Sequence, residues 1–76
     1  MLQYHVAFYL PRGEDRMFVA EVLDFPGAVS QGFDLADARG MIASALEEMA
    51  ESYLEEGRPL PTPSPAASDP DADYME

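Results

Sequence analysis

The sequence predicts an α+β fold, in which one long helix packs on one face of a three-stranded antiparallel sheet. Two stretches, residues 2–10 and 17–23, are rich in aromatic and β-branched side chains and have the period of two that is typical of strands. A turn and a short third strand follow, at residues 24–27 and 28–31. Residues 35–56 then repeat apolar side chains every three or four positions, which is the spacing of a helix.

The first two strands form a hairpin around the polar loop of residues 11–16. In the second strand, Phe18, Ala20 and Val22 share one face. The opposite face is also largely apolar, with Val19 at its centre. One helix covers only one face of a sheet, so the second apolar face favours a covering partner.

The stretch Asp24-Phe25-Pro26-Gly27 predicts the turn between the second and third strands. Aspartate is favoured at the first position of a turn, proline presets φ at a corner, and glycine supplies the positive φ of a type II turn. Gly32 is expected to break the third strand, and Asp34 to cap the helix that follows.

The helix is expected to run from Leu35 to about Glu56, with Gly57 as its stop. A helix of this length spans about 33 Å, which exceeds the length of five-residue strands, so its C-terminal end is expected to project beyond the sheet. Its apolar stripe comprises Leu35, Ala38, Ile42, Ala45, Leu46, Met49 and Tyr53.

After Gly57 the composition changes to alternating prolines, at positions 59, 61, 63 and 65. Two interpretations stay open for this segment. It forms a fourth, outermost strand whose prolines block further pairing, or it is a solvated polyproline II linker. Residues 66–76 are acidic and patternless, which predicts a disordered C-terminal tail. The expected organisation is one domain over residues 1–65 and a tail over residues 66–76.

Charge and composition exclude several classes of protein. Fifteen acidic residues against four arginines give a net charge of −11, which disfavours direct binding to nucleic acid and favours a basic partner or simple solubility. There is no cysteine, and a single histidine leaves little for a transition-metal site. Neither a signal peptide nor a membrane-spanning stretch is recognisable, so we expect a cytoplasmic protein.

Catalytic candidates are few. Glu21 and Asp24 form a carboxylate pair at a strand end, but without a third carboxylate the turn role of Asp24 is the more economical interpretation. His5 fits a packing or interface histidine, and Ser30 has no base beside it in the pattern. The sequence therefore predicts no enzyme, no metal site and no cofactor.

Three features together resemble the HicB family of antitoxins. They are the Asp-Phe-Pro-Gly turn at residues 24–27, the Ser-Gln-Gly at residues 30–32 and the proline-rich exit after Gly57, within an ordered stretch from residue 2 to about 65. The resemblance implies a partial RNase-H-like fold without a working nuclease site. It also implies a role, which is to bind and mask a small basic toxin of the HicA type that cleaves mRNA.

The sequence departs from many members of that family in one respect. They carry a DNA-binding domain after this module, whereas here an acidic tail follows, so direct binding to DNA is not expected. The alternatives to the antitoxin function are a degenerate RNase-H-like hydrolase that uses Glu21 and Asp24, or an orphan oligomeric module that serves a structural or ligand-binding role without a toxin.

Two interaction surfaces are predicted. The toxin-binding candidates are glutamates of the helix, namely Glu47, Glu48, Glu51, Glu55 and Glu56. The candidates for a homodimer or tetramer interface are Val19 on the open face of the sheet and Tyr53 and Leu54 near the helix end.

Overall fold

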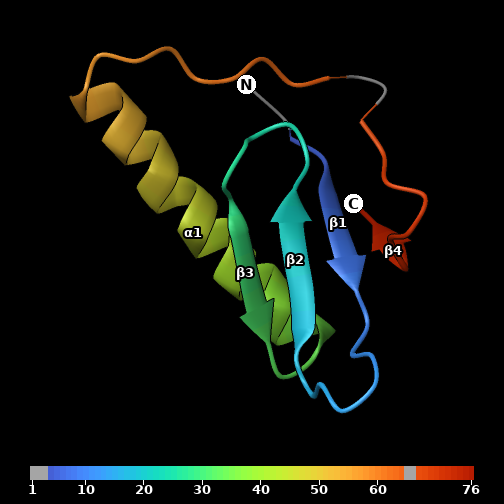
Figure 1. Cartoon of the computed structure of the whole chain (residues 1–76). Coiled ribbons are helices and arrows are strands. Elements are labelled where there is room, and N and C mark those ends of the chain that lie inside the picture. Colours follow the sequence, from blue (N-terminus) through green and yellow to red (C-terminus); the bar gives the residue numbers. More distant parts are fainter. Residues whose placement is uncertain (1–3, 65–66) are drawn as a thin grey trace.

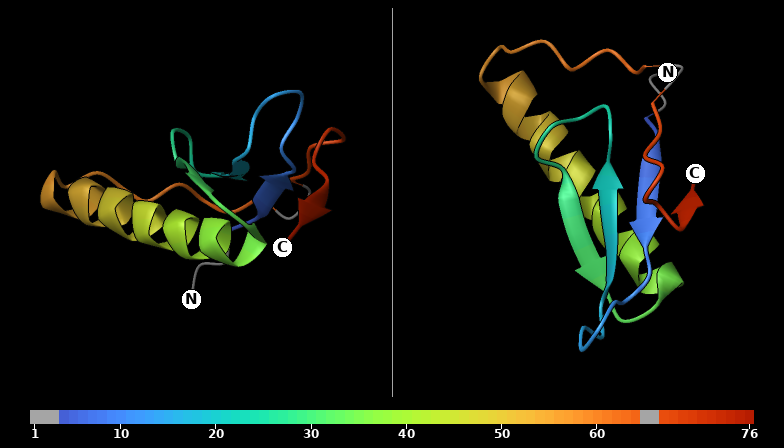
Figure 2. Two further views of the ribbon diagram at one scale, coloured as in Figure 1. Left: turned by 90° about the horizontal axis from the view of Figure 1, so that it is seen from below. Right: turned by 45° about the vertical axis from the view of Figure 1, so that its right-hand side comes forward.

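The computed structural model describes residues 4–64 and 67–76 and confirms the α+β fold (Figure 1). One helix lies against one side of a four-stranded antiparallel sheet (Figure 2). The elements in chain order are β1 (Val6–Tyr9), β2 (Phe18–Val22), β3 (Val29–Gly32), α1 (Leu35–Glu55) and β4 (Tyr74–Met75).

The strands lie in the order β3-β2-β1-β4. Ala20 of β2 pairs with Phe8 of β1 on one side and with Ser30 of β3 on the other. Within the described residues, which exclude residues 2 and 3, both strands are shorter than the sequence suggested, because some of the residues that flank them bond elsewhere. The Leu10 N–H, for example, donates to the carboxylate of Asp73 at 2.8 Å instead of to a neighbouring strand.

The core lies between α1 and one face of the sheet. Phe8, Ala20 and Val22 contribute the sheet side, and Ala38 and Ile42 contribute the helix side. Phe25 and Ala28, from the β2–β3 connection, close one end of this core. The alternation of residues in the first two strands therefore identified the buried face correctly.

Both ends of α1 are capped by local hydrogen bonds. The Asp34 side chain accepts the Asp37 N–H at 2.7 Å, which satisfies one of the free donors of the first turn. At the other end Gly57 has a φ of 72°, and the Arg58 N–H returns to the Tyr53 carbonyl at 2.8 Å. This arrangement is a Schellman motif, and it ends the helix one residue before the expected Glu56.

The C-terminal half of α1 extends past the strands, as its length predicted (Figures 1 and 2). There its covering comes from the β2–β3 connection instead of from the sheet. The Phe25 and Tyr53 rings lie 5.0 Å apart, centroid to centroid. The Arg58 guanidinium lies 3.9 Å from the centroid of the Tyr53 ring.

The proline-rich segment forms no strand in the part described, residues 58–64. The interpretation as a fourth strand is therefore wrong for residues 58–64, whereas the interpretation as a solvated polyproline II linker stays a prediction; Pro65 falls outside the described residues. Leu60 packs against the core, and the Tyr4 hydroxyl donates to the Pro61 carbonyl at 2.6 Å. The segment is thus attached to the domain at defined points.

The fourth strand comes from the C-terminal segment, residues 67–76, which differs from the disordered tail that the composition suggested. Tyr74 pairs with Phe8 and Met75 with Ala7, on the outer edge of β1 (Figure 1). The composition did not predict this strand, because the segment has few apolar side chains and many carboxylates. Several of these carboxylates accept hydrogen bonds from other parts of the chain, and the composition does not show those bonds. The division of the chain into a domain over 1–65 and a separate tail over 66–76 stays a prediction.

Candidate functional site

Asp24 accepts hydrogen bonds from two segments that lie far from it in the sequence. Its side chain is only 3% exposed. One oxygen accepts the His5 backbone N–H at 3.0 Å, and the other lies 2.9 Å from His5 Nδ1 and accepts the Ser64 N–H at 3.0 Å. Asp24 therefore joins the start of β1, the end of β2 and the proline-rich segment.

These hydrogen bonds set the charge state of Asp24. Burial alone would raise its pKa, but the bonds from His5 and from the Ser64 N–H outweigh burial and lower the pKa below the ordinary value. The group is therefore a carboxylate held by donors. The structural role that the sequence suggested for Asp24 stays a prediction. The turn hydrogen bond runs from the Ala28 N–H to the Phe25 carbonyl at 3.1 Å, so the turn begins one residue after Asp24.

The other turn residues have clear geometric reasons. Gly27 has a φ of 90°, the value required at the second corner of a type II turn after Pro26. Gly32 is the last residue of β3, where a Cβ atom would lie 2.3 Å from the Ala38 backbone nitrogen. Its absent side chain lets the first turn of α1 approach the sheet, so Gly32 allows close packing as well as ending the strand.

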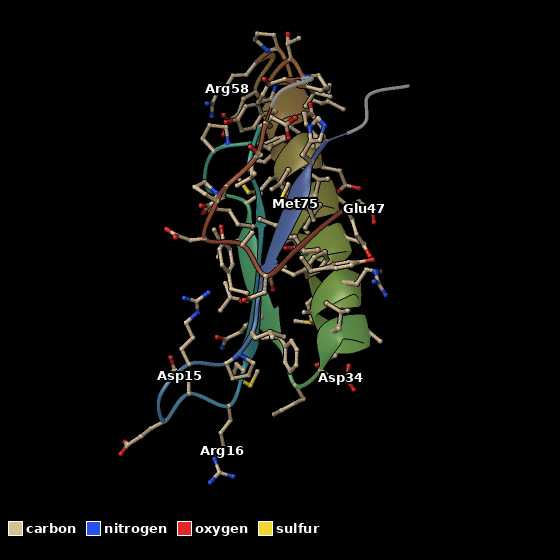
Figure 3. The ribbon with its side chains drawn as sticks, turned by 90° about the vertical axis from the view of Figure 1, so that its right-hand side faces the viewer. Asp15, Arg16, Asp34, Glu47, Arg58 and Met75 are labelled. Carbon is tan, nitrogen blue, oxygen red and sulfur yellow. The ribbon has the colours of Figure 1, made fainter. Side chains whose placement is uncertain are left out.

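The five glutamates predicted to bind the toxin do not form a single group. Glu47, Glu51 and Glu55 follow one another at four-residue intervals on α1 and are exposed, so they form one line along the helix. We call this line the acidic row. Glu47 projects from the side of α1 that faces away from the sheet (Figure 3). Glu48 flanks the row, whereas Glu56 stands at the helix C-cap and pairs with Arg58 at 3.2 Å.

The acidic row is costly for an isolated helix. Carboxylates spaced four residues apart repel each other. Glu55 also lies in the last turn of α1, where the partial negative charge of the helix dipole disfavours anions, and that turn contains no basic residue. The arrangement is unfavourable for α1 alone and well suited to a positively charged partner.

A second acidic group lies in the C-terminal segment, where the carboxylates of Asp69, Asp73 and Glu76 bond to other parts of the chain. Asp73 accepts the Leu10 N–H and Arg12 at 3.1 Å, and Asp69 accepts the Tyr9 hydroxyl at 2.6 Å. Glu76 pairs with Arg39 of α1. These contacts hold the C-terminal segment along the outer edge of β1. Through Arg39 they also join the segment to α1.

The same contacts shift the pKa values of these groups. The Tyr9 hydroxyl lowers the pKa of Asp69, and the Leu10 N–H, followed by Arg12, lowers that of Asp73. The Arg39 guanidinium lowers the pKa of Glu76. These side chains therefore stabilise the packing of the C-terminal segment against β1 most when they are charged. The alternation of aspartates at 69, 71 and 73 is no guide to this role, because residues 69–72 form a turn in which the Ala72 N–H donates to the Asp69 carbonyl at 3.0 Å.

The predicted oligomer residues lie in three different settings. Val19 lies on the open face of the sheet and is partly exposed. Tyr53 packs between Phe25 and Arg58 within the chain, so much of its ring is already covered. Leu54 is 65% exposed and lies beside the acidic row. Whether they contact a second copy stays a prediction.

In the described ranges the structure shows no group of three potential metal-ligating side chains and no pocket. Among the same residues, no helix is both long and apolar enough to cross a lipid bilayer. The acidic row and the exposed apolar residues are therefore the candidate functional surfaces of the described residues.

The chain was compared with models of known protein families. A family described as HicB-like antitoxin of bacterial toxin–antitoxin systems matches residues 3–72, which is nearly the whole chain. No curated protein matches the chain, and no solved structure matches it.

Proposed function

Because the chain belongs to the HicB-like family of antitoxins of bacterial toxin–antitoxin systems, we propose that it binds and masks a small basic toxin of the HicA type, which cleaves mRNA. The family supports the antitoxin role, and the net charge of −11 supports a basic partner. The proposed mechanism is occlusion: the antitoxin covers the basic surface with which the toxin holds its RNA.

The acidic row is the observation that carries the choice of surface. Glu47, Glu51 and Glu55 are exposed and mutually repulsive, and no ion pair within the described ranges engages them. A local arrangement that opposes helix stability is typical of a functional site, where a partner supplies the compensation. A basic toxin relieves this repulsion on binding.

Leu54 adds an apolar contact to the same surface. It is 65% exposed and follows Glu51 by three residues, so the two side chains lie next to each other on α1. Interfaces commonly combine a desolvated apolar centre with a charged rim, and the rim accelerates association. We therefore propose Leu54 as the centre of the toxin contact and the acidic row with Glu48 as its rim.

The proposal is for a non-enzymatic, cytoplasmic protein that forms a homodimer or tetramer. The competing hydrolase needs Glu21 and Asp24 as free ligands, but both Asp24 oxygens already accept hydrogen bonds. Purified protein is expected to show no nuclease activity with magnesium or manganese. It is also expected not to shift promoter DNA at physiological salt, because its four arginines face an excess of carboxylates.

The test starts from the genes that neighbour the one for this chain, one of which is expected to encode a small basic protein. That protein is expected to cleave RNA alone and to lose this activity when the chain is added in equimolar amount. The chain should form a stable complex with it in size-exclusion chromatography. Undiminished RNA cleavage at excess chain would contradict the antitoxin function.

A further inference from the structure

The two sides of the three-stranded unit β3-β2-β1 differ in what covers them. The outer edge of β1 is covered by β4, with the Val6 N–H donating to the Glu76 carbonyl and the Glu76 N–H to the Val6 carbonyl, both at 2.9 Å. Charged residues, Asp73 and Glu76, flank that covering strand. The opposite edge, formed by β3, has no neighbouring strand among the described residues.

β3 also lacks the features that usually protect a free edge. Natural edge strands carry charges, prolines or bulges that prevent pairing with another chain. Residues 28–33, which contain β3, hold neither a charged side chain nor a proline, in a protein with a net charge of −11. This is the part of the molecule where two copies can approach with little repulsion between them.

The hydrogen-bond pattern defines which groups are free. The Val22 N–H donates to the Ala28 carbonyl at 2.9 Å, so Ala28 belongs to a hydrogen-bonded pair with β2. Such pairs alternate along an antiparallel ladder, so Ser30 and Gly32 also bond to β2. The backbone N–H and C=O groups of Val29 and Gln31 therefore point outward, away from the sheet.

Exposed apolar side chains gather on the same side. Val29 is 50% exposed, and Phe33, which directly follows β3, is 78% exposed. On α1, Ala38 lies against Gly32 of β3, and Met41 follows Ala38 by three residues, so Met41 lies on the β3 side of the helix. Met41 is 48% exposed. By contrast Arg39, on the other side of α1, reaches Glu76 next to β4.

We propose that the outer edge of β3 is the interface with a second copy of this chain. The two β3 strands pair antiparallel about a twofold axis at Ser30, and Val29 of each copy exchanges both backbone hydrogen bonds with Gln31 of the other. The two four-stranded sheets become one continuous sheet, and Met41 and Phe33 border the junction. A second copy is the occupant that fits, because residues 28–33 carry no charged side chain to attract the basic toxin that we propose. The Asp37 carboxylate, which accepts the Phe33 N–H at 2.9 Å, lies at the end of the junction.

This inference rests on the self-association included in the proposed function and is independent of toxin binding. It assigns the assembly to the β3 edge instead of to Val19, Tyr53 and Leu54. The remaining charge of both copies opposes association, so the dimer is expected to tighten as salt is added.

The first test is Gln31→Pro in the full chain. Proline removes the outward N–H of Gln31, which bonds to nothing in the sheet, so the fold is expected to survive while the dimer is lost. Sedimentation should give twice the 8.4 kDa chain mass for the unaltered protein and the single-chain mass for Gln31→Pro. Circular dichroism checks that the variant keeps its helix.

The second test is a cross-link at the symmetry axis. In the proposed pairing the two Ser30 residues form a non-hydrogen-bonded pair, with Cα atoms about 4.5 Å apart, which suits a disulfide. Because the chain has no cysteine, Ser30→Cys should oxidise to a single cross-linked dimer, and Val19→Cys serves as the control that should not.

The outcomes distinguish self-association of the chain from the assignment of its interface to β3. A monomeric unaltered protein would overturn both self-association and the β3 interface, and it would leave toxin binding untouched. A dimer that cross-links through Val19→Cys and not through Ser30→Cys would keep self-association and overturn the β3 interface. Loss of the dimer in Gln31→Pro together with cross-linking of Ser30→Cys supports it.

Discussion

The molecule contains two acidic regions that differ in what surrounds their carboxylates. In the C-terminal segment, Asp69, Asp73 and Glu76 each meet a hydroxyl, backbone or arginine donor of the same chain. In the acidic row of α1, Glu51 and Glu55 stand four residues apart, and no ion pair among the described residues engages either of them. Equal charge therefore has opposite consequences: the first region holds the fold together, and the second weakens the helix that carries it.

The difference shows why net charge alone is a poor guide to a binding surface. Both regions contribute to the value of −11. The carboxylates of the C-terminal segment would have to leave their intramolecular partners to bind a basic protein, whereas the acidic row offers its charge at no such cost. We therefore assign the partner site to the helix.

Asp24 is a buried carboxylate that, like those of the C-terminal segment, accepts hydrogen bonds from the same chain. Its substitution is expected to have the largest effect on stability. Asp24→Asn keeps the shape of the side chain but replaces an acceptor oxygen with an amide, which faces donors from His5 and Ser64. We expect a loss of about 2–3 kcal/mol in the free energy of unfolding, measured by urea denaturation. A loss below about 0.5 kcal/mol would show that the His5 and Ser64 bonds contribute little.

The second prediction concerns acid. The folded-state pKa of Asp24 lies below its ordinary value of 3.8, so the unfolded chain binds more protons near that pH. The stabilisation by Asp24 is present above this value and is lost as the pH falls through the lower, folded-state pKa. Asp69, Asp73 and Glu76 act with the same sign. Urea midpoints measured from pH 6 down to pH 2 should fall, and Asp24→Asn should flatten the decline.

The third prediction concerns the C-terminal segment. Glu76→Gln removes the charge that faces Arg39, and Asp73→Asn removes the charge that faces Arg12. These contacts lie at the surface, so the effect is expected to be local opening of β4. Amide hydrogen exchange of Val6 and Glu76 should become several-fold faster, whereas exchange of Ala20 in β2 should stay unchanged. Equal acceleration at Ala20 would mean that β4 supports the whole sheet.

The fourth prediction has the smallest effect, and it is an increase in stability instead of a decrease. Glu51→Gln removes repulsion from both Glu47 and Glu55 and is expected to stabilise the free protein by about 0.2–0.5 kcal/mol. Thermal unfolding measures the change. Glu14→Gln in the β1–β2 loop, whose side chain is exposed and outside the helix, is the matched control and should leave the midpoint unchanged. Destabilisation by Glu51→Gln would show that the acidic row has partners within the chain.

Much of the fold was predictable because its signals are local. The alternation of residues around Phe8 and Ala20 identified the core strands, and the Pro26-Gly27 turn and the Asp34 cap placed the junctions within a residue or two. β4 was not predictable, because its pairing depends on contacts that span about sixty residues of chain, such as Tyr9 with Asp69. No periodicity within residues 67–76 reports such contacts.

The candidate site was predictable only in part, for a similar reason. The sequence identifies an excess of glutamates in the helix, and the helical spacing separates Glu51 and Glu55 from the C-cap residue Glu56. What sequence could not show is which of the many carboxylates already have partners. That distinction depends on where Arg12, Arg39 and Arg58 lie in the folded chain.

The most direct test of the central claim compares two variants of equal net charge. Glu51→Lys/Glu55→Lys reverses the acidic row, and Glu14→Lys/Asp15→Lys reverses the same number of charges in the β1–β2 loop, at the opposite end of the molecule (Figure 3). Calorimetric titration with the proposed basic toxin should show about a 100-fold loss of affinity for the helix variant, and a loss of only about threefold for the loop variant. Equal losses in both variants would contradict the claim that the acidic row is the partner site.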